Sequence, residues 1–142
     1  MAKDTSQPLV PRPDELNLDF YKATVSANAL CVQRCKACGT WTHPARYFCP
    51  NCTSPDYSFE KTSGRATLHS YTVSHFSVEP AWKAMVPYVT IVAELEEGPR
   101  IVAAAKNIAP DAVKLDMPLR ITTENKSEEF AFFWAEPATG AR

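Results

Sequence analysis

The hydrophobic pattern between residues 14 and 29 predicts one amphipathic helix near the start of the chain. Its apolar side chains recur three or four residues apart, at Leu16, Phe20, Ala23 and Ala27. Asp14 follows a proline and is typical of a helix N-cap, while Asn28 can adopt the left-handed conformation that ends a helix. We therefore expect a helix over 14–29, followed by a short β segment at 30–33.

From residue 57 onward the pattern changes to short segments rich in β-branched and aromatic residues, separated by turn residues. A short strand is predicted at Tyr57–Lys61, and five main strands are predicted at 66–73, Tyr88–Leu95, 100–106, 118–123 and 129–134. Residues 96–99 read as a hairpin connection. Five strands predict a closed Greek-key barrel of the OB type, and a β-sandwich remains the alternative.

Four of the five cysteines, Cys35, Cys38, Cys49 and Cys52, form two C-x-x-C motifs separated by ten residues. Each motif presents two thiolates from one tight turn, so the pair builds a tetrahedral sulfur site. This predicts one structural zinc ion. Iron in a rubredoxin-like site is the alternative, and a thioredoxin-type redox pair would leave the second motif unexplained. Four protein ligands leave no open position for substrate, so we expect a non-catalytic metal.

These patterns divide the chain into four parts. Residues 1–13 are predicted to form a flexible arm, 14–56 the N-terminal helix and zinc ribbon, 57–136 the OB-fold domain, and 137–142 a tail. The expected fold class is mainly β. Within the barrel segment, 76–86 is expected to be a long proline-bearing loop that is mobile or faces a partner, and 107–113 a short helical or turn segment.

The remaining cysteine and the three histidines show no grouping typical of a catalytic site. Cys31 belongs to a predicted strand and is expected to be a buried small side chain rather than a reactive thiol. His43 lies between the two cysteine motifs and is expected on the surface or behind the metal ligands. His69 and His75 lie in or just beyond a predicted strand, and no adjacent nucleophile or carboxylate accompanies them, so we expect no catalytic residue.

Composition narrows the function classes. The formal net charge is −1, with 16 acidic and 15 basic residues, so no broad basic field points to nucleic acid or to an anionic membrane. The longest apolar run, 101–105, is too short to span a bilayer, and no signal-peptide pattern follows the first residues. An odd number of clustered cysteines does not suggest disulfides. We expect a soluble cytoplasmic protein.

Two aromatic groups leave a binding role open. Trp41, Tyr47 and Phe48 accompany a few basic residues in the cysteine module, where they could stack on a base or cover the metal site. The loop 76–86 and the residues beside it carry Phe76, Trp82, Met85 and Tyr88, which are typical of a partner surface. A single-stranded nucleic-acid-binding module is therefore the alternative to a protein partner.

The order of several segments resembles a known family. The chain contains L-C-V-Q-R-C-K-A-C-G, then C-P-N-C, S-G-R-A-T-L-H-S-Y-T-V, P-Y-V-T-I-V-A-E-L-E-E-G-P-R and D-A-V-K-L-D-M-P-L-R-I. Together these look like the OB-fold family with an N-terminal rubredoxin-like zinc ribbon that is catalogued as domain of unknown function thirty-five. The resemblance covers about residues 14–136, and it differs at Asn28, where the family often has glycine.

The resemblance implies an acyl-CoA-associated accessory protein. Such proteins pair with thiolase-fold enzymes, namely thiolases, related synthases and thiolase-like aldolases, and the partner supplies the catalytic residues. It implies a structural zinc ion on the four cysteines, an acyl-CoA ligand shared with the partner, and a complex with two copies of each subunit. The resemblance does not identify any residue of this chain as a contact for CoA. An independent enzyme acting on CoA esters is a third, weaker hypothesis.

The cysteine assignment can be tested by metal content. Cys38→Ser or Cys49→Ser should unfold the cysteine-bearing segment 35–52, which we call the zinc module. The reason is that binding free energy of about 10 kcal/mol or more is coupled to folding in such sites. Cys31→Ala is the matched control and should leave the zinc content per chain unchanged in elemental analysis. A soluble, partner-competent Cys38→Ser protein would contradict the first expectation, and a halved zinc content in Cys31→Ala would contradict the choice of ligands.

Overall fold

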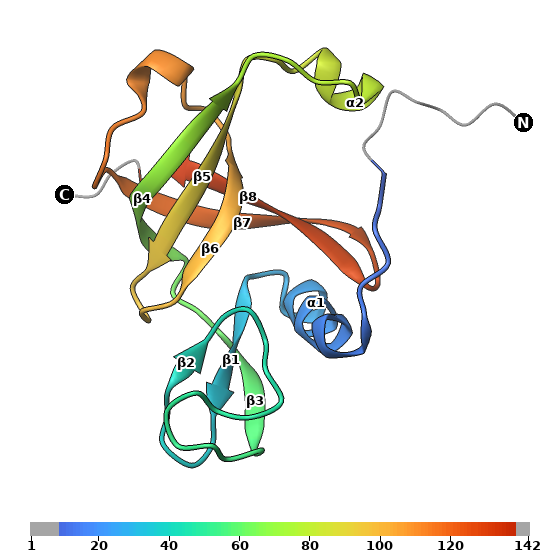
Figure 1. The fold of residues 1–142 in the computed structure, drawn as a ribbon, viewed down its shortest axis with the longest axis vertical. Helices are drawn as coiled ribbons and strands as arrows, with labels where there is room; N and C mark the ends of the chain where they lie inside the picture. The colour runs from blue at the N-terminus through green and yellow to red at the C-terminus, as the bar shows by residue number, and fades with distance from the viewer. Residues whose placement is uncertain (1–8, 139–142) are drawn as a thin grey trace, which may run out of the picture.

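The computed structural model describes residues 9–138, which form a small sheet, a closed barrel and a helix beside both (Figure 1). The elements in chain order are α1 (Glu15–Ala27), β1 (Cys31–Cys35), β2 (Trp41–Thr42), β3 (Tyr57–Lys61), β4 (Arg65–Ser74), α2 (Pro80–Lys83), β5 (Tyr88–Leu95), β6 (Arg100–Ala105), the 3-10 turn η1 (Pro110–Ala112), β7 (Pro118–Ser127) and β8 (Phe130–Pro137). The predicted mainly β fold with an N-terminal helix is confirmed. Most of the predicted arm and tail lies outside the described residues.

Helix α1 begins and ends where the sequence predicts. The side chain of Asp14 accepts a hydrogen bond from the backbone N–H of Asn17 at 3.0 Å, which satisfies one of the free donors of the first turn. Asn28 ends the helix with φ 49°, a left-handed conformation that asparagine tolerates. Phe20 and Thr24 are the fully buried residues of this helix, so its packing face is narrow and centred on one aromatic ring.

The small sheet has the order β2-β1-β3, with both pairs antiparallel. Strand β3 pairs with β1 along its whole length, from Cys31 opposite Lys61 to Cys35 opposite Tyr57. The sequence pattern groups β3 with the barrel segment 57–136, whereas its hydrogen bonds place it in the zinc-module sheet. A strand's pattern does not encode its partner, because the pairing is set by contacts distant in sequence. By hydrogen bonding, the barrel begins at β4.

The five main strands close into a barrel in the order β4-β5-β6-β8-β7, which confirms the predicted OB-type barrel over the sandwich. All neighbours are antiparallel except β6 and β8, which share a short parallel contact at Ala104 and Trp134. Strand β5 alternates strictly between buried and half-buried residues, as expected for one face turned to the barrel interior. Its buried residues are Val89, Ile91, Ala93 and Leu95.

The connection between β4 and β5 is more ordered than predicted. It contains α2, a single helical turn that begins at Pro80, whose fixed φ suits the first helical position. Trp82 on α2 lies 5.3 Å from Tyr88 and 6.4 Å from Phe132, measured between ring centroids. These contacts fix the connection over the barrel. Among the described residues no helix is long and apolar enough to cross a membrane.

Phe20 joins the helix, the small sheet and the barrel. Its ring centroid lies 5.2 Å from His43 in the zinc module, 6.2 Å from Phe59 on β3 and 5.7 Å from Phe133 on β8. Phe20 also belongs to one hydrophobic cluster that continues through the small sheet into the barrel interior. The zinc module and the barrel therefore share a core.

Replacement of Phe20 by alanine should destabilise the whole chain. Loss of a buried phenylalanine costs about 3–5 kcal/mol, because it removes transferred apolar surface and leaves a cavity. We expect one lowered unfolding transition in denaturant, reported alike by probes in the zinc module and in the barrel. The control Phe48→Ala removes an exposed ring and should change stability by less than about 0.5 kcal/mol. Two separate transitions in Phe20→Ala would contradict a shared core.

Candidate functional site

The first cysteine knuckle is a tight turn directly after β1. The N–H of Gly39 donates to the carbonyl of Cys35 at 3.0 Å, and the N–H of Cys35 donates to the carbonyl of Thr40 at 2.9 Å. Gly39 has φ 76°, a left-handed conformation that glycine adopts without steric cost. This turn brings Cys35 and Cys38 to the same side of the chain.

The second knuckle repeats this hydrogen-bond pattern without a glycine. The N–H of Thr53 donates to the carbonyl of Cys49, and the N–H of Cys49 donates to the carbonyl of Ser54, both at 2.9 Å. Thr53 has φ 65°, which is unfavourable for a β-branched residue. Its hydroxyl donates to the carbonyl of Cys52 at 2.6 Å. The sequence pattern gives no sign of the role of Thr53.

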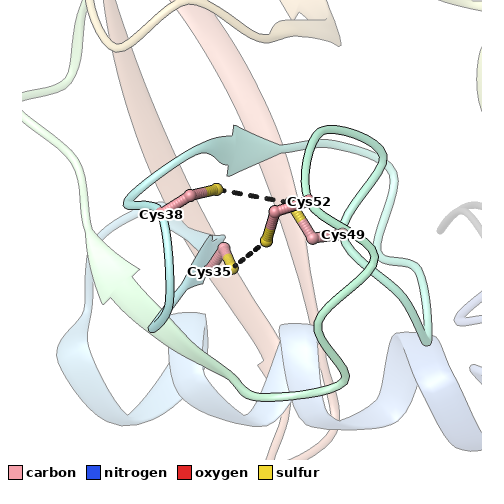
Figure 2. A group of neighbouring side chains, drawn as sticks. All are labelled: Cys35, Cys38, Cys49 and Cys52. Carbon is pink, nitrogen blue, oxygen red and sulfur yellow. Dashed lines mark hydrogen bonds between the residues drawn. The ribbon is translucent and has the colours of Figure 1, made fainter.

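The two knuckles bring all four sulfur atoms together (Figure 2). The Sγ atoms of Cys35 and Cys52 lie 3.6 Å apart, as do those of Cys38 and Cys49, and all four ligand atoms lie within 4.8 Å of one another. A tetrahedral zinc ion with bonds of about 2.3 Å separates its sulfur ligands by about 3.8 Å. The observed set therefore fits a structural zinc ion.

The surroundings of the sulfurs favour negative charge at one ligand and oppose it at another. The hydroxyl of Thr40 lies 3.1 Å from the Cys38 sulfur and the amide of Asn51 lies 3.6 Å from it. Hydrogen bonds from these side chains lower the pKa of Cys38 to about 5. A backbone N–H at Ser54 favours the Cys52 thiolate, but partial desolvation and the neighbouring sulfurs raise its pKa to about 12. A divalent cation stabilises the thiolate form of both cysteines, so the donor set suits a metal-bound state.

The other singled-out residues stay apart from the sulfur cluster. Cys31 is buried beside α1, with its sulfur 3.6 Å from the carbonyl of Ala23, and burial raises the pKa of its thiol. His43 packs on Phe20 instead of lying on the surface, and burial lowers its pKa. His69 and His75 are exposed. The structure brings none of these side chains into a catalytic arrangement among the described residues.

One basic residue at the edge of the zinc module already contacts both an aromatic ring and a carboxylate. The guanidinium of Arg34 lies 4.9 Å from the centroid of the Trp41 ring and 3.5 Å from a carboxylate oxygen of Glu60. One of the three basic residues near the metal is therefore already neutralised. Tyr47 and Phe48 are 60% and 63% exposed, so they cover neither the metal nor the core.

A second feature lies on the barrel. A cavity of about 350 Å³, which we call the aromatic groove, opens beside α2 on the outer surface of the barrel. Its principal lining residues come from α1, α2, β5, β6 and β8, and they are Tyr21, Trp82, Tyr88, Val102, Phe132 and Trp134. The alternation of Phe130, Phe132 and Trp134 near the end of the sequence predicts a core face, and Phe130 is indeed buried, whereas Phe132 and Trp134 are not. The structure leaves both residues half-buried in the groove wall instead.

Two family models match the chain. The first, described as ChsH2, rubredoxin-like zinc ribbon domain, matches residues 27–58, and the second, described as ChsH2, C-terminal OB-fold domain, matches residues 60–124. A DUF35 domain-containing scaffold protein from Methanocaldococcus jannaschii is 32% identical over 97 residues, which make up 68% of each chain. This chain belongs to the DUF35 family. The family expected from the sequence motifs is thereby confirmed, including its zinc ribbon and its OB fold.

Two further comparisons connect DUF35 domains with enzymes. A probable enoyl-CoA hydratase alpha subunit from Thermomonospora curvata is 38% identical over 113 residues, which cover 78% of this chain. Those residues cover only 34% of the relative, so the chain spans about a third of its length. A solved structure named Ltp2-ChsH2(DUF35) aldolase matches with a TM-score of 0.75 and 32% identity, covering 94% of this chain and 100% of that one.

The hydroxyl beside the Cys38 sulfur should matter for metal affinity. Thr40→Val keeps the shape of the side chain but removes the hydrogen bond, and loss of such an outer contact typically weakens metal binding by about 10- to 100-fold. Competition with a chromogenic chelator measures this change. Thr67→Val, at an exposed threonine on β4, is the control and should retain full affinity. Equal zinc affinity in the two variants would contradict this role of Thr40.

Proposed function

We propose that this DUF35 protein is a non-catalytic subunit that binds a thiolase-fold enzyme, stabilises it and helps to hold its acyl-CoA substrate. The observation that carries the proposal is the match over nearly the whole chain to the structure named Ltp2-ChsH2(DUF35) aldolase. The name of that structure supports an enzyme partner. The thiolase fold of the partner, the acyl-CoA ligand and the two copies of each subunit come from the family resemblance.

The absence of a catalytic role for this chain rests on its chemistry. The sulfur cluster uses all four positions of a tetrahedral ion, so a zinc ion held by Cys35, Cys38, Cys49 and Cys52 has no position for a reacting water. His69 and His75 are exposed, and no side-chain hydrogen bond joins either of them to a nucleophile or a carboxylate among the described residues. Relatives named as scaffold proteins support the same conclusion. On this proposal, the metal maintains the shape of the docking module.

Exposed apolar side chains supply candidate contacts for the partner and for the thioester. Tyr47 and Phe48 protrude from the zinc module, and Phe76 and Val78, before α2, are 77% and 84% exposed. Scattered single apolar residues need no explanation, but adjacent aromatic residues on one loop favour an interface. We propose that the zinc module and α1 dock on the enzyme, while the barrel and the connection 75–87 face the thioester.

The remaining expectations stay part of this proposal. They are the division into a zinc-ribbon part and an OB-fold part, and a cytoplasmic location. The alternative, a single-stranded nucleic-acid-binding module, is weaker, because Arg34 is paired with Glu60, which leaves Lys36 and Arg46 as the two cations of the zinc module without an ion pair in the described residues.

Co-purification tests the proposal directly. The tagged full chain, recovered from its native host, should bring down a thiolase-fold enzyme in equal amounts, and native mass spectrometry should give two copies of each subunit. The purified chain alone should turn over no CoA ester. Phe48→Ser should reduce recovery of the enzyme, whereas Leu115→Ser, at an equally exposed residue on the barrel (61%), should not. Recovery of nucleic acid or single-strand-binding proteins instead would contradict the proposal.

A further inference from the structure

The aromatic groove occupies the position where OB folds bind ligands. In this fold the outer face of the second and third strands, together with the connections between strands one and two and between strands four and five, forms the usual binding surface. Here β5 and β6 are the second and third barrel strands, and α2 lies in the connection before β5. Figure 1 shows α2 at the end of the barrel away from the small sheet. The groove lies on β5 and β6 and is bounded by α2 and β8.

The walls of the groove are built from aromatic rings in contact with one another. Phe132 lies 6.4 Å from Trp82 and 6.5 Å from Trp134, with ring planes inclined by 76° and 68°. Such edge-to-face arrays expose both flat faces and edges, to which another flat ring can pack. The volume of about 350 Å³ falls within the range of roughly 300–1,000 Å³ typical of small-molecule sites. The shape and lining therefore suit a flat apolar body.

One cation beside the groove wall, Lys106, makes no direct ion pair among the described residues, although its charge helps that of Lys126 to lower the pKa of the Glu124 carboxyl. The ammonium of Lys106 lies 5.9 Å from the centroid of the Trp134 ring and makes no ion pair within residues 9–138. Lys126 lies 5.4 Å from the Phe132 centroid, but its ammonium is 2.7 Å from a carboxylate oxygen of Glu124. The other oxygen of Glu124 accepts a hydrogen bond from the Trp134 indole, which fixes that ring in the wall. Lys106 is thus available to an anionic group on a ligand.

We propose that the aromatic groove binds the flat, ring-bearing acyl part of a carboxylic acid or its thioester, with Lys106 facing the anionic end. The inference rests on the proposed function and narrows it, because it assigns the acyl group to the class that contains fused or aromatic rings rather than unbranched chains. A free carboxylate and the phosphates of a CoA thioester offer Lys106 the same chemistry. The nucleotide itself lies outside the groove.

The three tryptophans provide an internal test of position. The zinc-loaded full chain, labelled with ¹⁵N, is titrated with 2-naphthoate, and the three indole N–H signals are followed by NMR. The signals of Trp82 and Trp134 should shift and saturate, whereas that of Trp41, which lies in the zinc module beneath Arg34, should not move. Saturable binding that moves Trp41 alone, or no saturable shift at all, would overturn the assignment.

Two variants separate the groove from the rest of the surface. Val102→Glu places a carboxylate on a groove residue that is 60% exposed, and it should weaken binding of naphthoate by at least about tenfold. Leu115→Glu makes the same change at matched exposure outside the groove and should leave binding unchanged.

A third variant tests the charge: Lys106→Gln should weaken binding of naphthoate by about two- to fivefold, as for an exposed charge pair, without affecting binding of neutral 2-naphthalenemethanol. Equal binding by Val102→Glu and the unchanged protein would overturn the proposal.

Three ligand comparisons identify the source of the anion and the class of acyl group. If 2-naphthoyl-CoA shifts the two signals at lower concentration than naphthoate, the thioester is the ligand; if not, the free acid is. Tighter binding of decanoate than of naphthoate, or equal shifts with CoA alone, would overturn the ring-bearing assignment.

Co-purification of the enzyme is measured in parallel with Val102→Glu. If the enzyme co-purifies but naphthoate binds to no form of the chain, this inference fails and the accessory role stands. If naphthoate binds but the enzyme does not co-purify, the accessory role fails and the groove assignment stands.

Discussion

The packing of Phe20 is the contact on which the rest of the structure depends. A zinc module and a small barrel are each too small to bury much apolar surface alone. The ring of Phe20 reaches His43, Phe59 and Phe133, so one side chain on α1 connects the metal-bearing loops, the small sheet and the barrel. The cysteine knuckles form one side of this junction and the closed barrel forms the other. The orientation between the two modules follows from the helix that both of them contact.

The two functional features of the molecule therefore have different tasks. The sulfur cluster is closed and stabilises local structure, so its contribution to function is the shape of the module that carries Tyr47 and Phe48. The aromatic groove lies on the barrel, where Trp82 and Trp134 stand in its wall. In the proposed function, these separate positions allow one part of the chain to hold an enzyme partner while another part contacts a ligand. This division agrees with a family whose members are found in enzyme complexes and are named as scaffolds.

Sequence reasoning succeeded where the signal is local. The helix limits follow from Asp14 and Asn28, which satisfy or end the backbone at their own positions. The four cysteines follow from the spacing of two turns, and the barrel strands follow from alternation along each strand. Sequence reasoning failed where a contact depends on residues that are distant in the chain. The pairing of β3 with β1 and the packing of Trp82 against Phe132 have no signature in the segments that contain them. The left-handed backbone at Thr53 is likewise imposed by the closed knuckle.

By itself the sequence determined the grouping of Cys35, Cys38, Cys49 and Cys52 as a candidate metal site, the helix α1 and the number of barrel strands, because each of these depends on residues within a few positions of one another. Only the tertiary structure decided that Phe132 and Trp134 face a groove, that Arg34 is paired with Glu60 and that Lys106 makes no ion pair within residues 9–138. The physical reason is the same in each case. Burial and charge pairing are properties of surfaces assembled from several elements, and a linear pattern states only what each element can bring to that surface.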